Sequence, residues 1–161
     1  MDAKSWKHLA AWMGVTFAAG IAGSATSMDA PQFYGALVKP PWAPPAWLFG
    51  PAWTILYVLI AVAAWLAWQR APIRTTKGLW AIFAAQLVAN AAWSWLFFGA
   101  KSGVAAFWGA VVLEVLVLAT LVAFWQVRRV SGALLMPYAG WVAFATALTW
   151  SVWRANPVLL G

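Results

Sequence analysis

Apolar residues dominate five long stretches of this chain, and charged residues mark where each stretch stops. Four windows without Asp, Glu, Lys or Arg are 9–28, 40–69, 78–100 and 130–153. A fifth window, 102–127, is interrupted only by Glu114. A helix needs roughly 20 apolar residues to cross the core of a bilayer. The pattern therefore predicts an all-α integral membrane bundle of five transmembrane helices that forms a single domain.

The predicted spans are separated by short loops, with one exception. We expect spans over about 6–26, 47–69, 78–99, 104–126 and 134–154, and a Pro-rich outer loop over 28–46. Five prolines between Pro40 and Pro51 fix φ and remove amide donors, so this stretch cannot be a continuous helix. The loop is therefore expected to form a semi-rigid cap over one end of the bundle.

Composition supports the membrane class and excludes others. The chain is 65% hydrophobic and 8% charged, whereas soluble domains are about 25% charged. A soluble domain of this size cannot hide five helices that are apolar on all sides. The net charge of +7 is scattered between apolar windows and forms no basic stripe, so a nucleic-acid partner is not expected. The absence of Cys excludes disulfides and thiolate chemistry.

Basic residues are distributed unequally between the two sides of the predicted bundle. One side would carry Lys4, Lys7, Arg70, Arg74, Lys77, Arg128 and Arg129. The other would carry Lys39, Lys101 and Arg154. Because basic residues concentrate on the cytoplasmic side, we expect the N-terminus inside and the C-terminus outside, in a bacterial inner membrane. Trp6 and Trp12 favour a retained first helix; a cleaved signal is the alternative, since small residues follow at 22–26.

Polar residues inside the spans are few, and they fall on shared helix faces. Gln86 and Asn90 are four residues apart, and Trp93 continues their face. An unpaired polar group in hydrocarbon costs several kcal/mol, so these amides are expected to point into the bundle. Similar faces combine Trp53 with Tyr57, and Trp141 with Ala145 and either Leu148 or Thr149. The faces predict either interhelical hydrogen bonds or a site for a planar ligand.

Two ionisable residues need separate interpretation. Glu114 is the only acid within a predicted span, where a carboxylate is costly. It is expected to be protonated or paired at a helix contact, or else to couple proton movement to transport. His8 is the only histidine and is expected at the membrane edge rather than as a haem ligand. The sequence shows no pattern typical of hydrolytic, nucleotide-driven or metal-dependent chemistry.

Three linked motifs resemble one known family. Residues 33–57 read FYGALVKPPWAPPAWLFGPAWTILY and resemble the first loop and second helix of the TspO/MBR family, also called tryptophan-rich sensory or translocator proteins. Residues 86–94, with Gln86, Asn90 and Trp93, resemble its third helix. Residues 137–148, followed by 153–156, resemble its fifth. The motifs occur in the family's order and spacing over nearly the whole chain.

The resemblance implies a five-helix bundle, often dimeric, that binds porphyrins, sterols and benzodiazepine-like drugs in a pocket under the first loop. By motif position the pocket would be lined by Tyr34, Trp53, Asn90, Trp141, Ala145 and Leu148. Family members have been proposed to carry or scavenge tetrapyrroles, to act in stress responses and to degrade porphyrin in light. The chain departs from the family pattern at two positions: it has Thr149 where the family commonly has Asn, and Trp150 where a sterol motif needs Tyr. We therefore expect a tetrapyrrole ligand rather than a sterol.

These observations predict a membrane receptor or carrier for protoporphyrin IX or haem, with no obligatory cofactor. Trp53 and Trp141 would sandwich the ring, Asn90 would donate a hydrogen bond and Lys39 would pair with a propionate. The full expected site is Tyr34, Lys39, Trp53, Tyr57, Gln86, Asn90, Trp93, Trp141, Ala145 and Leu148. Alternatives are a Trp-dependent photochemical porphyrin-degrading enzyme and a proton-coupled exporter using Glu114. A homodimer is expected through small residues, namely Gly99, Gly103, Ala105, Ala106, Gly109 and Ala110.

Overall fold

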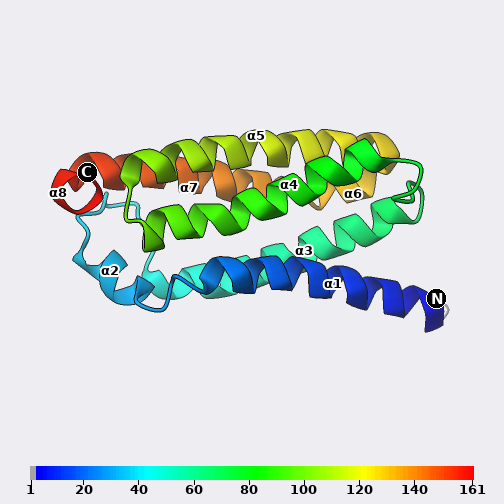
Figure 1. The fold of residues 1–161 in the computed structure, drawn as a ribbon, viewed down its shortest axis with the longest axis horizontal. Coiled ribbons are helices and arrows are strands. Elements are labelled where there is room, and N and C mark those ends of the chain that lie inside the picture. The colour runs from blue at the N-terminus through cyan, green and yellow to red at the C-terminus, as the bar shows by residue number, and fades with distance from the viewer. Residues whose placement is uncertain (1–2) are drawn as a thin grey trace.

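The five long helices of the described residues run side by side along the long axis of the molecule (Figure 1). The computed structural model describes residues 3–161, with side chains from Trp6 onward, and all regular structure over these residues is helical. The long helices are α1 (Ala3–Ser24), α3 (Phe49–Trp68), α4 (Lys77–Ser94), α5 (Gly103–Val127) and α7 (Met136–Ala155). Short elements are α2 (Ala30–Ala36), η1 (Ala46–Leu48), the π-helix η2 (Trp95–Gly99), α6 (Arg129–Ala133) and α8 (Pro157–Leu160). The predicted all-α class is confirmed.

Four stretches are long and apolar enough to cross a membrane. They are Ala46–Trp68, Lys77–Gly99, Gly103–Val127 and Arg129–Ala155. The expected count of five is thus not confirmed by length and composition. Helix α1 falls outside the set because Lys7, His8 and its glycines lower its mean hydropathy. It nevertheless packs along α3 and α4 as a full-length member of the bundle (Figure 1).

The two ends of the bundle differ in construction. We call the end that holds α2, residues 37–45 and α8 the capped end, at the left of Figure 1. The other end holds the start of α1, the turn 69–76 and α6, and we call it the opposite end. The predicted loop over 28–46 contains an unexpected helix, α2. Pro31 fits a first helical turn, whereas the prolines after position 39 keep residues 40–45 out of an α-helix.

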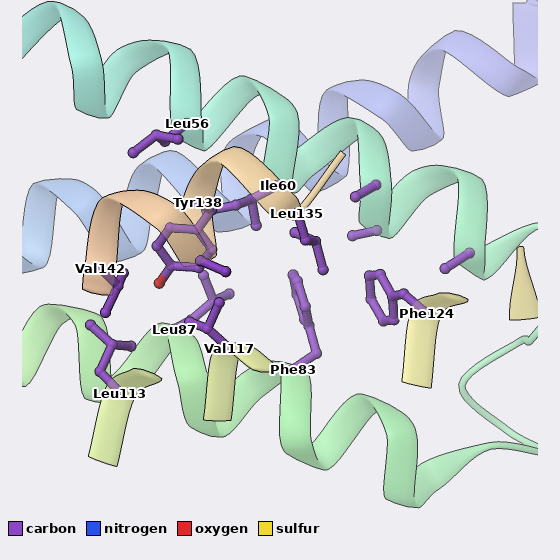
Figure 2. Packing of buried hydrophobic residues seen from close by; sticks show 14 of the residues in the cluster. Leu56, Ile60, Phe83, Leu87, Leu113, Val117, Phe124, Leu135, Tyr138 and Val142 are labelled. Carbon is purple, nitrogen blue, oxygen red and sulfur yellow. The ribbon is translucent and has the colours of Figure 1, made fainter. Parts of the chain in front are cut away.

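Aromatic side chains fill the opposite end. Phe83 of α4 stacks on Phe124 of α5 with ring centroids 5.6 Å apart, and both point into the core in Figure 2. Trp12 of α1 stacks on Trp80 at 4.7 Å. The Trp80 indole N–H donates to the carbonyl of Ala71 at 2.9 Å, which fixes the turn after α3. Alanines of α3 are fully buried here and allow close helix approach; they are Ala61, Ala63, Ala64 and Ala67.

Small residues of α5 serve packing within the protomer. A Cβ added at Gly103 would collide with the Trp153 ring, and one at Gly109 would meet Leu96 at 2.8 Å. Ala106 and Ala110 are buried. The face assigned to a homodimer from sequence is therefore occupied by α7, α4 and η2 of the same chain.

Hydrogen bonds attach the cap to the end of α7. The Asn156 side chain accepts from Val38 N–H at 2.8 Å and donates to the Val38 carbonyl at 2.8 Å. The Tyr34 hydroxyl donates to the carbonyl of Pro44 at 3.0 Å. Burial raises the pKa of Tyr34 above its usual range. These bonds hold α2 and residues 37–45 over the ends of the long helices.

Candidate ligand-binding cavity

A partly open cavity of about 300 Å³ lies in the capped half of the bundle. This volume falls at the lower end of the range for small-molecule sites, roughly 300–1,000 Å³. Its walls come from α1, α3, α4, η2 and α7, and α2 contributes Tyr34. The lining holds no Asp, Glu, Lys or Arg. Such a cavity suits a neutral, largely apolar body with a few directed polar atoms.

Aromatic rings form two walls of the cavity. On α3, Trp53 and Tyr57 are four residues apart and stack with centroids 5.6 Å apart. On the other side, Trp93 of α4 stacks on Phe97 of η2 at 5.5 Å with only 8° between the ring planes. Flat, pre-ordered ring faces favour a flat aromatic ligand, because stacking adds to the burial of apolar area.

A chain of hydrogen bonds runs from the cavity into the core. The Tyr57 hydroxyl donates to Asn90 Oδ1 at 2.7 Å. Asn90 Nδ2 donates to the Tyr138 hydroxyl at 3.1 Å, which donates in turn to Gln86 Oε1 at 2.9 Å. The amides of Gln86 and Asn90 therefore make hydrogen bonds between helices, which was one of the two roles expected from the sequence. Asn90 also lines the cavity, so it belongs to both.

At its cavity end, this chain of hydrogen bonds leaves one donor and one acceptor free to bind a ligand. Asn90 has two amide N–H groups and gives only one to Tyr138. The Tyr57 oxygen donates its proton to Asn90 and retains lone pairs that can accept. Thr149, at the position where the resemblance marks a departure, is buried and also lines the cavity. The cavity can therefore both donate to and accept from a bound ring.

Seven of the ten expected site residues line this one cavity. They are Tyr34, Trp53, Tyr57, Asn90, Trp93, Ala145 and Leu148. Gln86 does not, because it lies one helical turn deeper and is 1% exposed within the polar chain. Trp141 does not either, since its ring packs on Phe49 and Phe144 at 6.0 and 5.6 Å. The structure therefore places Trp93, rather than Trp141, beside the cavity with Trp53.

Lys39 has a structural role in the cap. Its ammonium donates to the carbonyls of Tyr34 and Leu37, both at 2.7 Å, and of Gly35 at 3.3 Å. These are orphan carbonyls at the end of α2, which a cation stabilises. Lys39 does not line the cavity, although the Tyr34 to which it is bound does.

Sequence reasoning missed the contributions of α1 and η2. Gly20 and Ser24 line the cavity from α1, and a Cβ at Gly20 would meet the Tyr57 ring at 2.5 Å. Their spacing of four residues was a readable signal of a small-residue face. The η2 residues Phe97 and Phe98 also line the cavity. The π-helix that aims them has no sequence signature of comparable clarity.

The remaining ionisable candidates lie away from the cavity. Glu114 is half-buried on α5, and its Oε2 is buried without a hydrogen-bond partner among the described residues. His8 packs on Trp68 at the opposite end, with ring centroids 4.4 Å apart. Over residues 3–161 no three His, Cys, Asp or Glu side chains come together as metal ligands.

Comparison with known proteins agrees with the sequence motifs. The sequence profile of the TspO/MBR family matches residues 12–154. The chain belongs to the TspO/MBR family. This match contains every residue that lines the cavity, from Gly20 to Val152. The resemblance stated from the motifs is thereby confirmed.

Individual TspO/MBR relatives match over most of their length. The tryptophan-rich protein TspO of Chlorobaculum tepidum is 38% identical over 154 residues, which cover 92% of this chain and 96% of that protein. The tryptophan-rich sensory protein of Cereibacter sphaeroides is 36% identical, covering 88% and 90%. The human translocator protein is 36% identical, covering 78% and 75%. The chain is thus an integral membrane protein of this family.

Proposed function

We propose that this protein is a membrane receptor or carrier for a tetrapyrrole, such as protoporphyrin IX or haem, bound in the cavity beneath the cap. The main support is the cavity itself, in which two stacked aromatic pairs flank an uncharged space. Membership of the TspO/MBR family agrees with this ligand class.

In this proposal the ring binds against Trp53 and Trp93, which line the cavity from α3 and α4. The second Asn90 N–H donates to an acceptor on the edge of the ligand, and the Tyr57 oxygen accepts from any donor that the ligand places there. Because no charged side chain lines the cavity, the propionates stay at its mouth. Lys39 is the cation assigned to them, and it must give up part of its bonding to the α2 carbonyls.

Membrane placement is part of the same proposal. Helix α1 is 22 residues long and lies along α3 and α4, so it acts as the fifth span although its composition is less apolar. The N-terminus is cytoplasmic, the C-terminus is outside and the membrane is the bacterial inner membrane. The positive charges of the opposite end support this orientation. The side chain of Lys4, which the charge count includes, lies outside the described residues.

A homodimer uses the outward side of α5 in place of the small-residue face. Four apolar side chains at helical spacing are exposed there, namely Val104, Trp108, Val112 and Val115. They form a stripe on one side of the helix. This stripe faces lipid in the protomer and is available to a second copy.

A light-driven porphyrin-degrading enzyme is the second candidate. It is favoured by the presence of two tryptophans, Trp53 and Trp93, on the cavity wall, where an excited ring can exchange electrons with them. The proton-coupled exporter has less support, because Glu114 does not line the cavity.

The test is a titration of the purified protein with protoporphyrin IX in the dark, followed by Trp fluorescence. We expect saturable quenching that weakens about tenfold or more in Asn90→Ala and Trp53→Phe. Trp125→Phe, at an exposed site near the end of α5, is the matched control and should bind normally. Absence of saturable quenching in the wild type would contradict the proposal.

Illumination then separates the two candidates. A carrier leaves the porphyrin spectrum unchanged in light, whereas an enzyme converts it at a rate that depends on the cavity tryptophans. Comparing Trp93→Phe with Trp141→Phe decides which indole assists Trp53. If Trp141→Phe abolishes the conversion and Trp93→Phe does not, the pairing of Trp53 with Trp141 that the sequence predicted would be supported.

A further inference from the structure

A second groove, of about 260 Å³, lies at the opposite end of the bundle, between α1 and the end of α3. It is open and lined by His8, Ala11, Trp12, Val15, Trp68 and Ile73. The groove shares no residue with the tetrapyrrole cavity. The two sites are therefore structurally independent.

Aromatic contacts make the floor of this groove rigid. Trp68 is held by the His8 ring, with centroids 4.4 Å apart and planes inclined by 48°. Trp12 is stacked on Trp80 with 22° between their planes. The floor is therefore fixed by the fold before any ligand arrives, which lowers the ordering cost of binding.

Apolar side chains on the rim are about half exposed. Val15 is 49% exposed and Ile73 is 47% exposed. Trp6, two residues before His8, is 56% exposed and suits the membrane–water boundary. The groove thus runs from this boundary along α1 into the level of the acyl chains.

The described segments that line the groove carry charges of one sign. Lys7 adjoins His8, Arg70 follows Trp68 by two residues and Arg74 adjoins Ile73; all three side chains are exposed. The segments 6–15 and 68–77 contain no acidic residue. An apolar groove with a basic rim at the membrane surface complements a phosphate headgroup joined to an acyl chain.

We propose that the groove binds one anionic phospholipid from the leaflet at this end. An acyl chain lies along Val15 and Ile73, and the phosphate is held by Lys7, Arg70 and Arg74. Neither a soluble anion nor a neutral lipid meets both halves of the site, since the first leaves the apolar groove empty and the second leaves the cations unused.

The test counts lipids retained by the detergent-purified protein in native mass spectrometry. Phosphatidylglycerol and phosphatidylcholine with identical acyl chains are added in turn. We expect one phosphatidylglycerol to be retained at an affinity about tenfold above phosphatidylcholine. The double variant Arg70→Gln/Arg74→Gln should lose this preference.

The matched control is Arg128→Gln/Arg129→Gln, which removes the same charge from the same end of the bundle at the α5–α6 junction. It should keep the preference. Val15→Trp, which fills the groove without changing charge, should lose both lipids while its melting temperature stays within a few degrees of the wild type. Equal losses in the two arginine pairs would show a general surface potential and overturn the proposal. Retention by Val15→Trp, or no preference in the wild type, would also overturn it.

Discussion

The two halves of the bundle use the same residue type for different purposes. At the opposite end, Trp80 packs edge-on against Phe83 and Phe124 at 5.6 Å each, and all three rings are buried between α4 and α5. At the capped end, Trp53 stacks on Tyr57 and meets Tyr138 edge-on at 6.2 Å, Trp93 stacks on Phe97, and a cavity of about 300 Å³ lies beside these rings. Tryptophan content alone therefore does not locate a ligand site. What distinguishes the two halves is that Trp53 and Trp93 line a cavity, whereas Trp80 is buried among other rings.

The chain of hydrogen bonds from Tyr57 through Asn90 and Tyr138 to Gln86 marks the boundary between these halves. Tyr138 lies within the core cluster in Figure 2, yet its hydroxyl bonds to Asn90, which faces the cavity. Core and site are thus connected through one amide. Substitutions on the two sides of this amide should separate stability from binding.

The largest expected effect is on the filled half. Phe124→Ala removes a ring that is fully buried among Trp80 and Phe83. Replacements of this kind cost roughly 3–5 kcal/mol of stability in protein cores. We expect the lower part of that range, because an unfolded membrane segment remains in apolar surroundings. Thermal unfolding in detergent measures the loss, and porphyrin affinity of the protein that remains folded should be unchanged.

Tyr138→Phe should be next in size. It removes the hydroxyl that accepts from Asn90 and donates to Gln86, so two buried amides each lose a hydrogen-bond partner. The expected loss of stability is about 1–3 kcal/mol. Tyr57→Phe is its counterpart, since Tyr57 lies at the cavity end of the chain. Tyr138→Phe should lower the melting temperature more, and Tyr57→Phe should lower ligand affinity more. The reverse order would contradict the assignment of the two ends.

Filling the cavity should affect binding alone. Ala145→Phe places a ring in space that is open in the structure, so stability should change by less than about 1 kcal/mol while affinity falls about tenfold or more. Isothermal titration with protoporphyrin IX gives the affinity. Ala143→Phe, two residues earlier on the exposed side of α7, is the control and should bind normally.

Loosening the cap should have a smaller effect, and mainly on rates. Asn156→Ala removes both bonds to Val38 and one to the carbonyl of Val152. We expect ligand dissociation to quicken about threefold to tenfold, with less than about 2 kcal/mol lost in stability. Stopped-flow fluorescence would follow the release. An unchanged rate would show that the ligand does not pass under the cap.

The smallest expected effect belongs to Lys39→Met. This variant loses bonds to three carbonyls of α2, so the cap should weaken for every ligand alike. If Lys39 also pairs with a propionate, protoporphyrin IX should lose about threefold more affinity than its dimethyl ester. Equal losses for acid and ester would confine Lys39 to its structural role.

Much of the fold was readable from the charges. The window broken by Glu114 predicted a helix over 104–126, and α5 covers Gly103–Val127. The signal is strong because each charge in hydrocarbon is costly. Helix α2 was missed because proline is compatible with a first helical turn as well as with a loop. The small residues of α5 indicated close packing correctly, but spacing cannot say whether the neighbour belongs to the same chain.

The site was partly predictable for a similar reason. Helical spacing placed Asn90 and Trp93 on one face, and both line the cavity. The same argument could not tell whether Trp141 faces the cavity or the helix beside it, because that depends on the rotation of α7. Lys39 was expected to pair with a propionate of the ligand, but its ammonium already donates hydrogen bonds to carbonyls at the end of α2, a helix that the sequence did not predict. Partners that arise from tertiary structure are not visible in the sequence.

Hydrogen–deuterium exchange with and without protoporphyrin IX tests the central claim most directly. If the capped half is the ligand site and the opposite half is a filled core, protection on binding should appear in residues 30–53 and in the α7 turn around Ala145. The amides of 69–80 and of α6 should not change. Equal protection at both ends, or protection confined to the opposite end, would contradict the division of the bundle into a site and a core.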